Sequence, residues 1–593
     1  MLKILKYLKP YIWQIVALFI LVSVSVYTTL LLPDYMAKII NEGIVLNNNN
    51  VILSTGLTML LYSLLGGVAT IGVGYFAARV ATGYSMDIRN KVFSQVESFS
   101  LSEFNKFSTA SLITRSTNDI QQIQMVLVLL LRMVLQAPIM GVGAIIKAYD
   151  LAPSMSWIIA LAVCILIGVI IVLFTIALPK FQLLQKLVDK LNMVTRQNLT
   201  GLRVIRAFNN EHIEENKFEK ANVDLTNTNL FVNQVMVIMQ PAMMLIFNLT
   251  AIAIIWFGAH LIGSGNLEVG NMLAFMQYAM QVIMSFLLLS FMFIMVPRAS
   301  VSGARISEIL ETKPTIADPK KPVKVAKVGR GLVEFKDVTF KYKSADEAAL
   351  CNISFVANPG ETTAIIGSTG SGKTTLISLI PRFYDVTSGE ILIDGINVRK
   401  MKLEDLYSKI GYVPQKGVLF SGTIESNIKY GAPKASESEV RKMAEIAQAK
   451  EFIKDLSDKY KSNIAQGGHN VSGGQKQRLS IARAIIHKPE IYIFDDSFSA
   501  LDFKTDAALR KALKKEVKNK TILIVAQRIS TILSADKILV LDDGKIVGQG
   551  THSELMKTSD IYREIASSQL SPGELSAYQV SLDGEKLAAK GAK

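Results

Sequence analysis

Long apolar runs fill the first half of the chain, and short strand-like and helix-like patterns alternate in the second half. A helix needs about 20 apolar residues to cross a bilayer. Six stretches are long enough, and they lie near residues 11–33, 51–78, 129–149, 154–179, 235–263 and 270–297. The pattern therefore predicts an all-α transmembrane domain with six helices.

The links between these stretches alternate between short and long. The links after the second and fourth stretches, at about 79–128 and 180–234, are polar, helix-like and rich in Lys and Arg. The positive-inside rule puts both in the cytoplasm. An even number of spans leaves both termini there too. We expect a multi-pass protein of the cell membrane (inner or plasma membrane), with cytoplasmic N- and C-termini.

The second half of the chain has the pattern of an α/β domain. Residues 311–331 are rich in Pro and Lys, as linkers are. Beyond them, strand-like runs such as "ETTAIIG" and "TILIVA" alternate with helical stretches, which predicts a parallel sheet with an antiparallel part. The expected segments are a transmembrane domain over 1–310, a linker over 311–331, an α/β domain over 332–570 and a tail over 571–593.

Charge and cysteine content narrow the function classes. The net charge is +15 and half of the residues are hydrophobic. In a membrane protein such cations gather at the cytoplasmic side, against anionic lipid headgroups, so we expect membrane lipids and no nucleic acid as partners. Cys164 and Cys351 lie in different segments, and no disulfide framework is expected.

The segment "GSTGSGKTT" matches the phosphate-loop pattern G-x-x-x-x-G-K-[ST] between a strand and a helix. In such a loop, backbone N–H groups and the helix N-terminus face the phosphates, and Lys373 reaches the β- and γ-phosphates. The Thr374 hydroxyl can bind Mg²⁺. We therefore expect ATP and Mg²⁺ as cofactors. The predicted cofactor-binding residues of the loop are Gly367, Ser368, Thr369, Gly370, Ser371, Gly372, Lys373, Thr374 and Thr375.

Downstream, "SGGQ" at 472–475 precedes a helix and then a strand that ends at Asp495. This order resembles the nucleotide-binding domain of ABC transporters. With six spans and two long cytoplasmic links ahead of it, nearly the whole chain resembles one half-transporter of the type IV (multidrug) exporter class. The resemblance implies an α/β P-loop domain of the ABC type and an ATP hydrolase coupled to transport, a translocase.

The resemblance also implies roles for single residues. Tyr342 would stack on adenine, although it could instead be a core aromatic of its strand. Gln415, in "GYVPQ", would contact Mg²⁺ and the attacking water; a plain loop amide is the alternative. Asp495 would bind Mg²⁺ together with Thr374 and Gln415. The signature residues, which would face the γ-phosphate held by the opposite domain, are Ser472, Gly473, Gly474 and Gln475. Residues 499–502 resemble the D-loop.

Two positions depart from the family pattern, both where the γ-phosphate is expected. Asp496 stands where a Glu usually acts as general base. Its carboxylate is one methylene shorter and so set back by about 1 Å, and general-base work requires hydrogen-bond reach. Gln527 stands where a switch histidine is usual, and an amide carries no proton or positive charge. Gln466 also replaces a more frequent Glu.

Together these departures resemble the degenerate subunit of a heterodimeric bacterial multidrug exporter. Its own Walker motifs, which are the phosphate loop at 367–375 and the strand end at Asp495, would bind ATP but hydrolyse it slowly. Its SGGQ would complete the active site of a second half-transporter that carries Glu and His at these positions. Three alternatives remain open: a slow homodimer, an exporter of a dedicated peptide or lipid, and a regulatory ATP-binding subunit that does not power transport.

Coupling and substrate features are less specific. The resemblance implies short transverse coupling helices near Phe107–Ile113 and Phe208–Ile213, the second docking on the opposite chain. Methionines at 272, 276, 280 and 284 would form one helix stripe, which suits hydrophobic or amphipathic substrates but also lipid contact or helix packing. Arg132 would lie near the cytoplasmic boundary, where it snorkels, forms an ion pair or lines the inner mouth.

Overall fold

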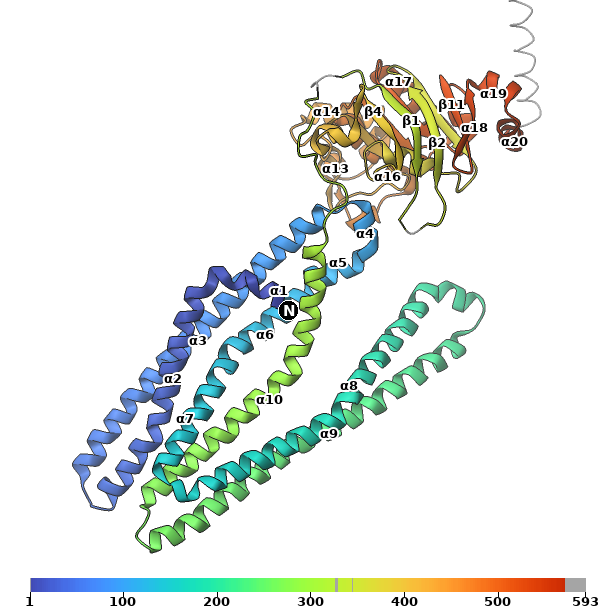
Figure 1. Cartoon of the computed structure of the whole chain (residues 1–593). Helices are drawn as coiled ribbons and strands as arrows, with labels where there is room; N and C mark the ends of the chain where they lie inside the picture. Colours follow the sequence, from blue (N-terminus) through green and yellow to red (C-terminus); the bar gives the residue numbers. More distant parts are fainter. Residues whose placement is uncertain (1, 326–328, 344, 571–593) are drawn as a thin grey trace, which may run out of the picture. The chain divides into compact units, whose positions relative to one another are not determined.

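The computed structural model describes residues 2–325, 329–343 and 345–570 (Figure 1), so the predicted tail 571–593 lies outside the described residues. The chain divides into two compact units. The first comprises residues 1–97 and 107–312, and the second comprises residues 98–106 and 313–593.

The first unit consists of helices. Among the described residues, six helical segments are long and apolar enough to cross a membrane, as predicted. The longest helices have 49 to 53 residues, far more than a bilayer needs, so the polar links are largely helical extensions of the spans. The helices and helical turns are α1 Leu2–Leu5, η1 Lys6–Tyr11, α2 Ile12–Lys38, η2 Ile39–Ile44, α3 Asn49–Glu97, α5 Thr109–Ser116, α6 Asn118–Leu129, η3 Leu130–Val134, α7 Leu135–Leu151, η4 Pro153–Met155, α8 Ser156–Ala207, α9 Glu211–Gly263 and α10 Val269–Glu311.

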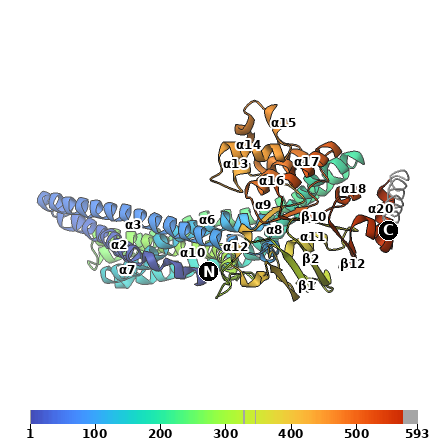
Figure 2. The same ribbon diagram turned by 90° about the horizontal axis from the view of Figure 1, so that it is seen from above.

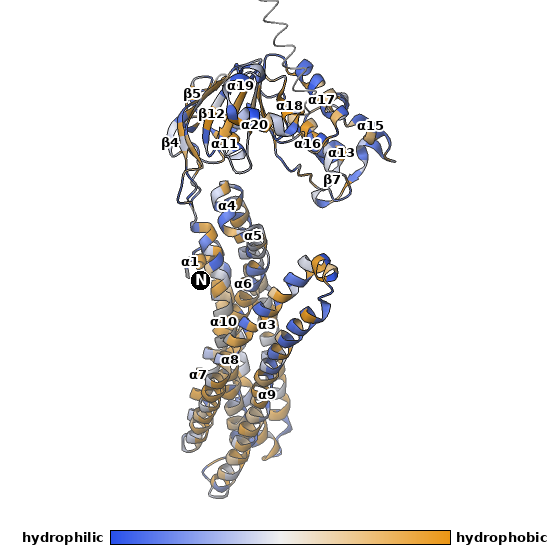
Figure 3. Ribbon diagram, turned by 90° about the vertical axis from the view of Figure 1, so that its right-hand side faces the viewer, coloured by the Kyte–Doolittle hydropathy of each residue, from blue (hydrophilic) through white to orange (hydrophobic). Residues whose placement is uncertain are grey.

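Helices α8 and α9 form a long hairpin in which hydrophilic and hydrophobic residues mix near the tip, whereas the other half is mostly hydrophobic (Figure 3). The first candidate coupling segment contains a separate short helix, α5, whose N-cap Ser108 accepts a hydrogen bond from the Ser111 N–H. The second candidate does not. Phe208 follows the end of α8 and α9 begins at Glu211, so the connection is too short for a helix of its own.

An ion pair joins three of the membrane helices. Lys147 Nζ on α7 lies 2.8 Å from Asp34 Oδ2 on α2. The Tyr278 hydroxyl on α10 donates to Asp34 Oδ1 at 2.6 Å and is itself fully buried. No sequence pattern indicates this partner of Lys147. The pairing with Asp34 explains how a lysine is accommodated in the mostly apolar helix α7.

Arg132 is not paired in the way that Lys147 is. Arg132 lies in the π-helical turn η3 and is exposed. It forms no ion pair or hydrogen bond with any described residue.

The methionines of the predicted stripe differ in their packing. Met272 packs on α9, since a Cβ at Gly258 would lie 2.6 Å from its sulfur. Met284, by contrast, is exposed. The stripe is therefore partly helix packing.

The second unit is an α/β domain. One sheet has the order β12-β11-β3-β10-β9-β6, parallel except for β12. An antiparallel sheet has the order β2-β1-β4-β5. The strands are β1 Val333–Phe340, β2 Leu350–Ala357, β3 Thr362–Gly367, β4 Ser388–Ile393, β5 Ile396–Asn397, β6 Ile410–Val413, β7 Gly422–Thr423, β8 Asn463–Ile464, β9 Ile491–Asp495, β10 Thr521–Val525, β11 Lys537–Asp542 and β12 Lys545–Gly550. The predicted parallel core with an antiparallel part is confirmed.

Helices cover the parallel sheet, and the small helices α13–α15 lie at the opposite end of this unit from β1 and β2 (Figure 2). Strand β9 is buried along its whole length, as its apolar run predicts for a central parallel strand. The helices are α4 Leu101–Phe107, α11 Lys373–Leu379, α12 Leu403–Ser408, α13 Ile424–Lys429, α14 Glu437–Ile446, α15 Lys450–Lys454, α16 Gly473–Ile486, α17 Phe503–Glu516, α18 Ile529–Ile532, α19 His552–Thr558 and α20 Asp560–Gln569, with short turns η5 Val398–Lys400, η6 Lys459–Lys461 and η7 Gln466–Gly468.

Candidate nucleotide-binding site

Four groups of predicted site residues follow the carboxyl ends of neighbouring parallel strands. These strands lie in the order β3, β10, β9, β6. Val525 on β10 pairs with Ile365 on one side and with Asp495 on the other. The phosphate loop, Gln527, Asp495–Asp496 and Gln415 therefore share one edge of the sheet. In open parallel sheets, this edge is where ligands bind.

The phosphate loop connects β3 to α11 and is shaped by glycines. Gly370 and Gly372 have φ of +87° and +97°, a region that side chains with a Cβ rarely adopt. Lys373 begins α11, and its Nζ donates to the carbonyl oxygens of Gly367 at 2.9 Å and Ser368 at 2.6 Å. Burial lowers the pKa of Lys373, and the nearby Asp496 and Asp495 oppose that shift. The buried ammonium of Lys373 thus bridges two carbonyl oxygens of the phosphate loop.

Asp495 ends β9 beside the first turn of α11. The Thr374 hydroxyl donates to Asp495 Oδ1 at 3.1 Å, and the Tyr412 hydroxyl on β6 also hydrogen-bonds to this carboxylate. Burial raises the pKa of Asp495, against the hydrogen bond from Thr374. A carboxylate and a hydroxyl form the all-oxygen donor set that Mg²⁺ prefers. These two residues therefore fit the predicted metal.

Asp496 is buried and has φ of +46°, unusual for a residue with a side chain. Its backbone N–H donates to the Val525 carbonyl at 3.0 Å, which continues the hydrogen bonding between β9 and β10 by one residue. Its Oδ2 accepts a hydrogen bond from Gln415 Nε2 at 3.3 Å. Burial raises the pKa of Asp496, while the bond from Gln415 and the charge of Lys373 act in the opposite direction. The structure thus brings together the two residues that were predicted to meet the attacking water.

Gln527 lies on the loop between β10 and α18. Its side chain is exposed and makes no hydrogen bond to other described residues. Its backbone is held by Gln569 at the end of α20, which donates to the Gln527 carbonyl at 2.8 Å. The contact of Gln569 could not be predicted from the sequence, because nothing in "REIASSQL" indicates which loop the amide would contact.

Tyr342 packs as a core-edge aromatic, one of the two roles weighed from the sequence, and stacking on adenine stays a prediction. Its ring packs edge-on against Phe340 and Tyr384, with centroids 4.7 and 5.3 Å away. Its hydroxyl lies 3.0 Å from the Thr375 hydroxyl at the end of the phosphate loop. The aromatic ring therefore belongs to the edge of the core and also borders the loop.

The signature segment forms the start of α16. Ser472 caps the helix, with its hydroxyl accepting from the Gln475 N–H and its own N–H donating to Gln475 Oε1. Gly473 is exposed, and a Cβ there would meet nothing within 4 Å. A Cβ at Gly474 would lie 3.1 Å from the Ala500 carbonyl in the predicted D-loop. Among the described residues, no hydrogen bond joins this segment to the phosphate loop of the same chain.

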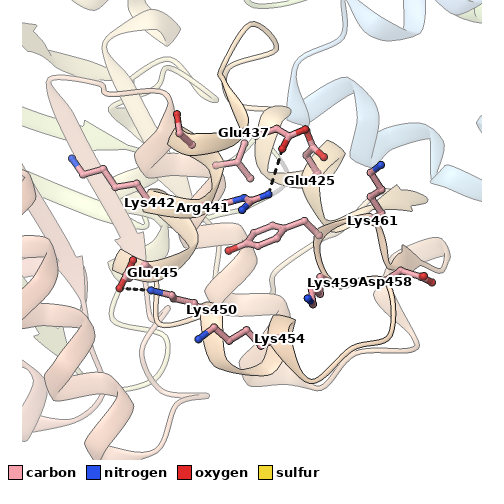
Figure 4. A pocket seen from close by; sticks show the side chains of 13 residues that line it. Glu425, Glu437, Arg441, Lys442, Glu445, Lys450, Lys454, Asp458, Lys459 and Lys461 are labelled. Carbon is pink, nitrogen blue, oxygen red and sulfur yellow. Dashed lines mark hydrogen bonds and ion pairs between the residues drawn. The ribbon is translucent and has the colours of Figure 1, made fainter.

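A separate hollow of about 900 Å³ lies among α13–α15 (Figure 4). Its lining is charged and includes the ion pairs Arg441–Glu437 at 3.4 Å and Lys450–Glu445 at 2.7 Å. None of the predicted nucleotide-site residues lines it. The hollow is therefore distinct from the candidate site.

Comparisons with known proteins agree with this architecture. Residues 15–286 match the ABC transporter transmembrane region, and residues 350–499 match the ABC transporter family. An uncharacterized ABC transporter ATP-binding protein of Mycobacterium tuberculosis is 40% identical over 95% of this chain and 97% of its own length. An ATP-dependent lipid A-core flippase of Haemophilus ducreyi is 30% identical over 95% of this chain and 97% of its own length.

Solved structures agree as well. A bacterial Atm1-family ABC exporter with ATP bound superposes with a TM-score of 0.79 at 26% identity, covering 94% of this chain and 98% of that one. The domain order, the membrane helices and the ATPase domain all match. The chain therefore belongs to the ABC transporter family, as a multi-pass exporter half-transporter whose ABC domain binds ATP and couples its hydrolysis to transport.

Proposed function

We propose that this chain is the degenerate-site subunit of a heterodimeric exporter of hydrophobic or amphipathic compounds. The observation that carries the proposal is the make-up of the sheet edge. The loop, Lys373, Thr374 and Asp495 are those of an ATP site, while Asp496 and Gln527 replace the usual base and switch residues. Such a site would hold ATP and hydrolyse it slowly.

The position of Asp496 supports slow hydrolysis. The side chain is short, and Oδ2 is engaged by Gln415. A misplacement of a catalytic group by about 1 Å costs on the order of 10²-fold in rate. Mg²⁺, when bound, would neutralise phosphate charge and polarise the γ-phosphoryl group. Thr374 and Asp495 would hold it, and Lys373 would bind the phosphate oxygens.

The signature supports a division of labour between two chains. Gly473 is open on its outer side, and the N-terminus of α16 offers free backbone N–H groups to an anion. ABC exporters work as dimers, and this end of α16 would complete the ATP site of the partner. The partner would carry Glu and His at the two substituted positions.

Exposed apolar residues support coupling across the dimer. Val418, Phe420 and Tyr430 of the ABC domain are all exposed, Tyr430 by 63%. Phe208, at the tip of the α8–α9 hairpin, is 72% exposed. Large exposed apolar groups mark interaction sites, so the hairpin tip of one chain would dock on the ABC domain of the other. Both surfaces would then lie in the cytoplasm.

A second candidate substrate class is a lipid, since a relative that matches over nearly the full length is named a lipid A-core flippase. The two classes are separated by reconstituting the purified complex in liposomes. ATP-driven extrusion of an amphipathic dye, without movement of a labelled phospholipid between leaflets, supports the multidrug proposal. Lipid movement alone would overturn it in favour of the flippase.

A further inference from the structure

The last described helix of the chain is hydrogen-bonded to the loop after β10. Gln569 Nε2 donates to the Gln527 carbonyl at 2.8 Å, and the Ile529 N–H donates to Gln569 Oε1 at 2.8 Å. One side-chain amide therefore satisfies a backbone acceptor and a backbone donor on either side of Arg528. Residues 526–528 lie between β10 and α18, and these two bonds fix their path.

Helix α20 is a firm base for this contact. Tyr562 and Ala566 are fully buried and share a core cluster with Ile529. The Tyr562 hydroxyl lies 2.7 Å from His552 Nδ1 on α19, and Ser559 caps the helix. Core packing, and not the loop, therefore determines where Gln569 lies.

We infer that Gln569 is a positioning residue for the switch position, Gln527. It does not touch the nucleotide. By holding the backbone on both sides of Arg528, it fixes the direction in which the exposed Gln527 side chain leaves the sheet edge. The inference rests on the proposed function only in assuming that Gln527 faces the γ-phosphate.

Two substitutions of Gln569 remove one or both of these hydrogen bonds, and a substitution of Ser568 serves as the control. Gln569→Ala removes both hydrogen bonds at an exposed side chain, so the fold should persist. Gln569→Glu keeps an acceptor for the Ile529 N–H but faces the Gln527 carbonyl with a carboxylate, which has no donor. Ser568→Ala is the matched control, because among the described residues the exposed Ser568 hydroxyl bonds only to the Ile565 carbonyl of its own helix.

The test measures the slow phase of release of fluorescent mant-ATP, with Mg²⁺, from the complex purified from its own membrane. We expect release to be about tenfold faster in Gln569→Ala, since small misplacements of binding groups have large effects. Gln569→Glu should lie in between, and Ser568→Ala should match the unmodified complex. Hydrogen exchange at the Ile529 amide should accelerate in Gln569→Ala even without nucleotide.

A double-mutant cycle with Gln527→Ala separates positioning from a general structural effect. If Gln569 acts through Gln527, adding Gln569→Ala to Gln527→Ala should change release by less than about twofold. Additive effects would overturn the inference. If Gln527→Ala speeds release but Gln569→Ala does not, the positioning role fails while the assignment of Gln527 stands. If neither changes release, both fail.

Discussion

The side-chain amide of Gln415 donates a hydrogen bond to the carboxylate of Asp496 at 3.3 Å. The loop after β6 thus holds the residue that follows β9. The bond occupies one oxygen of a carboxylate that is already short for general-base work.

Asp496→Asn should leave more than about half of the ATPase activity of the complex. The reason is that hydrolysis would occur mainly in the site built on the partner's Walker motifs. The measurement is phosphate release by the purified complex. The matched control replaces the carboxylate at the equivalent position of the partner and should abolish activity. Near-complete loss in Asp496→Asn would show that this residue is an essential base.

Gly473→Ala should lower ATPase activity of the complex more than about tenfold. The added methyl meets nothing in its own chain, so it would obstruct only a ligand approaching from outside. Gly168→Ala on α8, where a Cβ also has open space, is the control. Steady-state turnover and the thermal midpoint are measured on both variants. Unchanged turnover in Gly473→Ala would contradict the role of the signature.

Lys147→Met should destabilise the membrane helices by about 1–3 kcal/mol, because it leaves Asp34 as an uncompensated charge. The side chains of the pair are 37% and 31% exposed, which keeps the loss below that of a fully buried pair. Adding Asp34→Asn should restore much of the stability. Lys38→Met, which breaks an exposed pair with Glu42, should cost less than about 1 kcal/mol. Thermal midpoints in detergent distinguish these outcomes.

Protonation of Glu103 at acid pH should lower the stability of the folded chain. Burial alone would raise its pKa, but hydrogen bonds from Ser100, Ser102 and Thr315 lower it from 4.5 to about 2. A lowered pKa means that the folded state binds the proton less readily, so the stabilisation is present above pH 4.5 and is lost as the pH falls towards 2. The stability difference between the unmodified chain and Glu103→Gln should shrink over this range. A difference independent of pH would contradict it.

Much of the fold follows from the sequence because it rests on periodic patterns. The six spans follow from hydropathy, and the apolar run of β9 matches a fully buried parallel strand. The phosphate loop and Asp495 are adjacent because parallel strands present their carboxyl ends at one edge. These features depend on local composition and on general topology.

Other features depend on tertiary contacts that no local pattern encodes. The pairing of Lys147 with Asp34 joins residues 113 positions apart on α7 and α2. The contact of Gln569 with the Gln527 loop joins residues 42 positions apart through a side chain and a backbone group. No separate coupling helix forms at Phe208, because only residues 208–210 connect α8 to α9. The resemblance to the family does not specify the length of this connection.

The mass of the native complex decides whether this chain pairs with a different half-transporter. The chain is tagged, extracted gently from its own membrane and weighed as an intact assembly. We expect a 1:1 complex with a different half-transporter that carries Glu and His at the positions of Asp496 and Gln527. Two identical copies of this chain would contradict it, because Asp496 and Gln527 would then serve in both ATP sites.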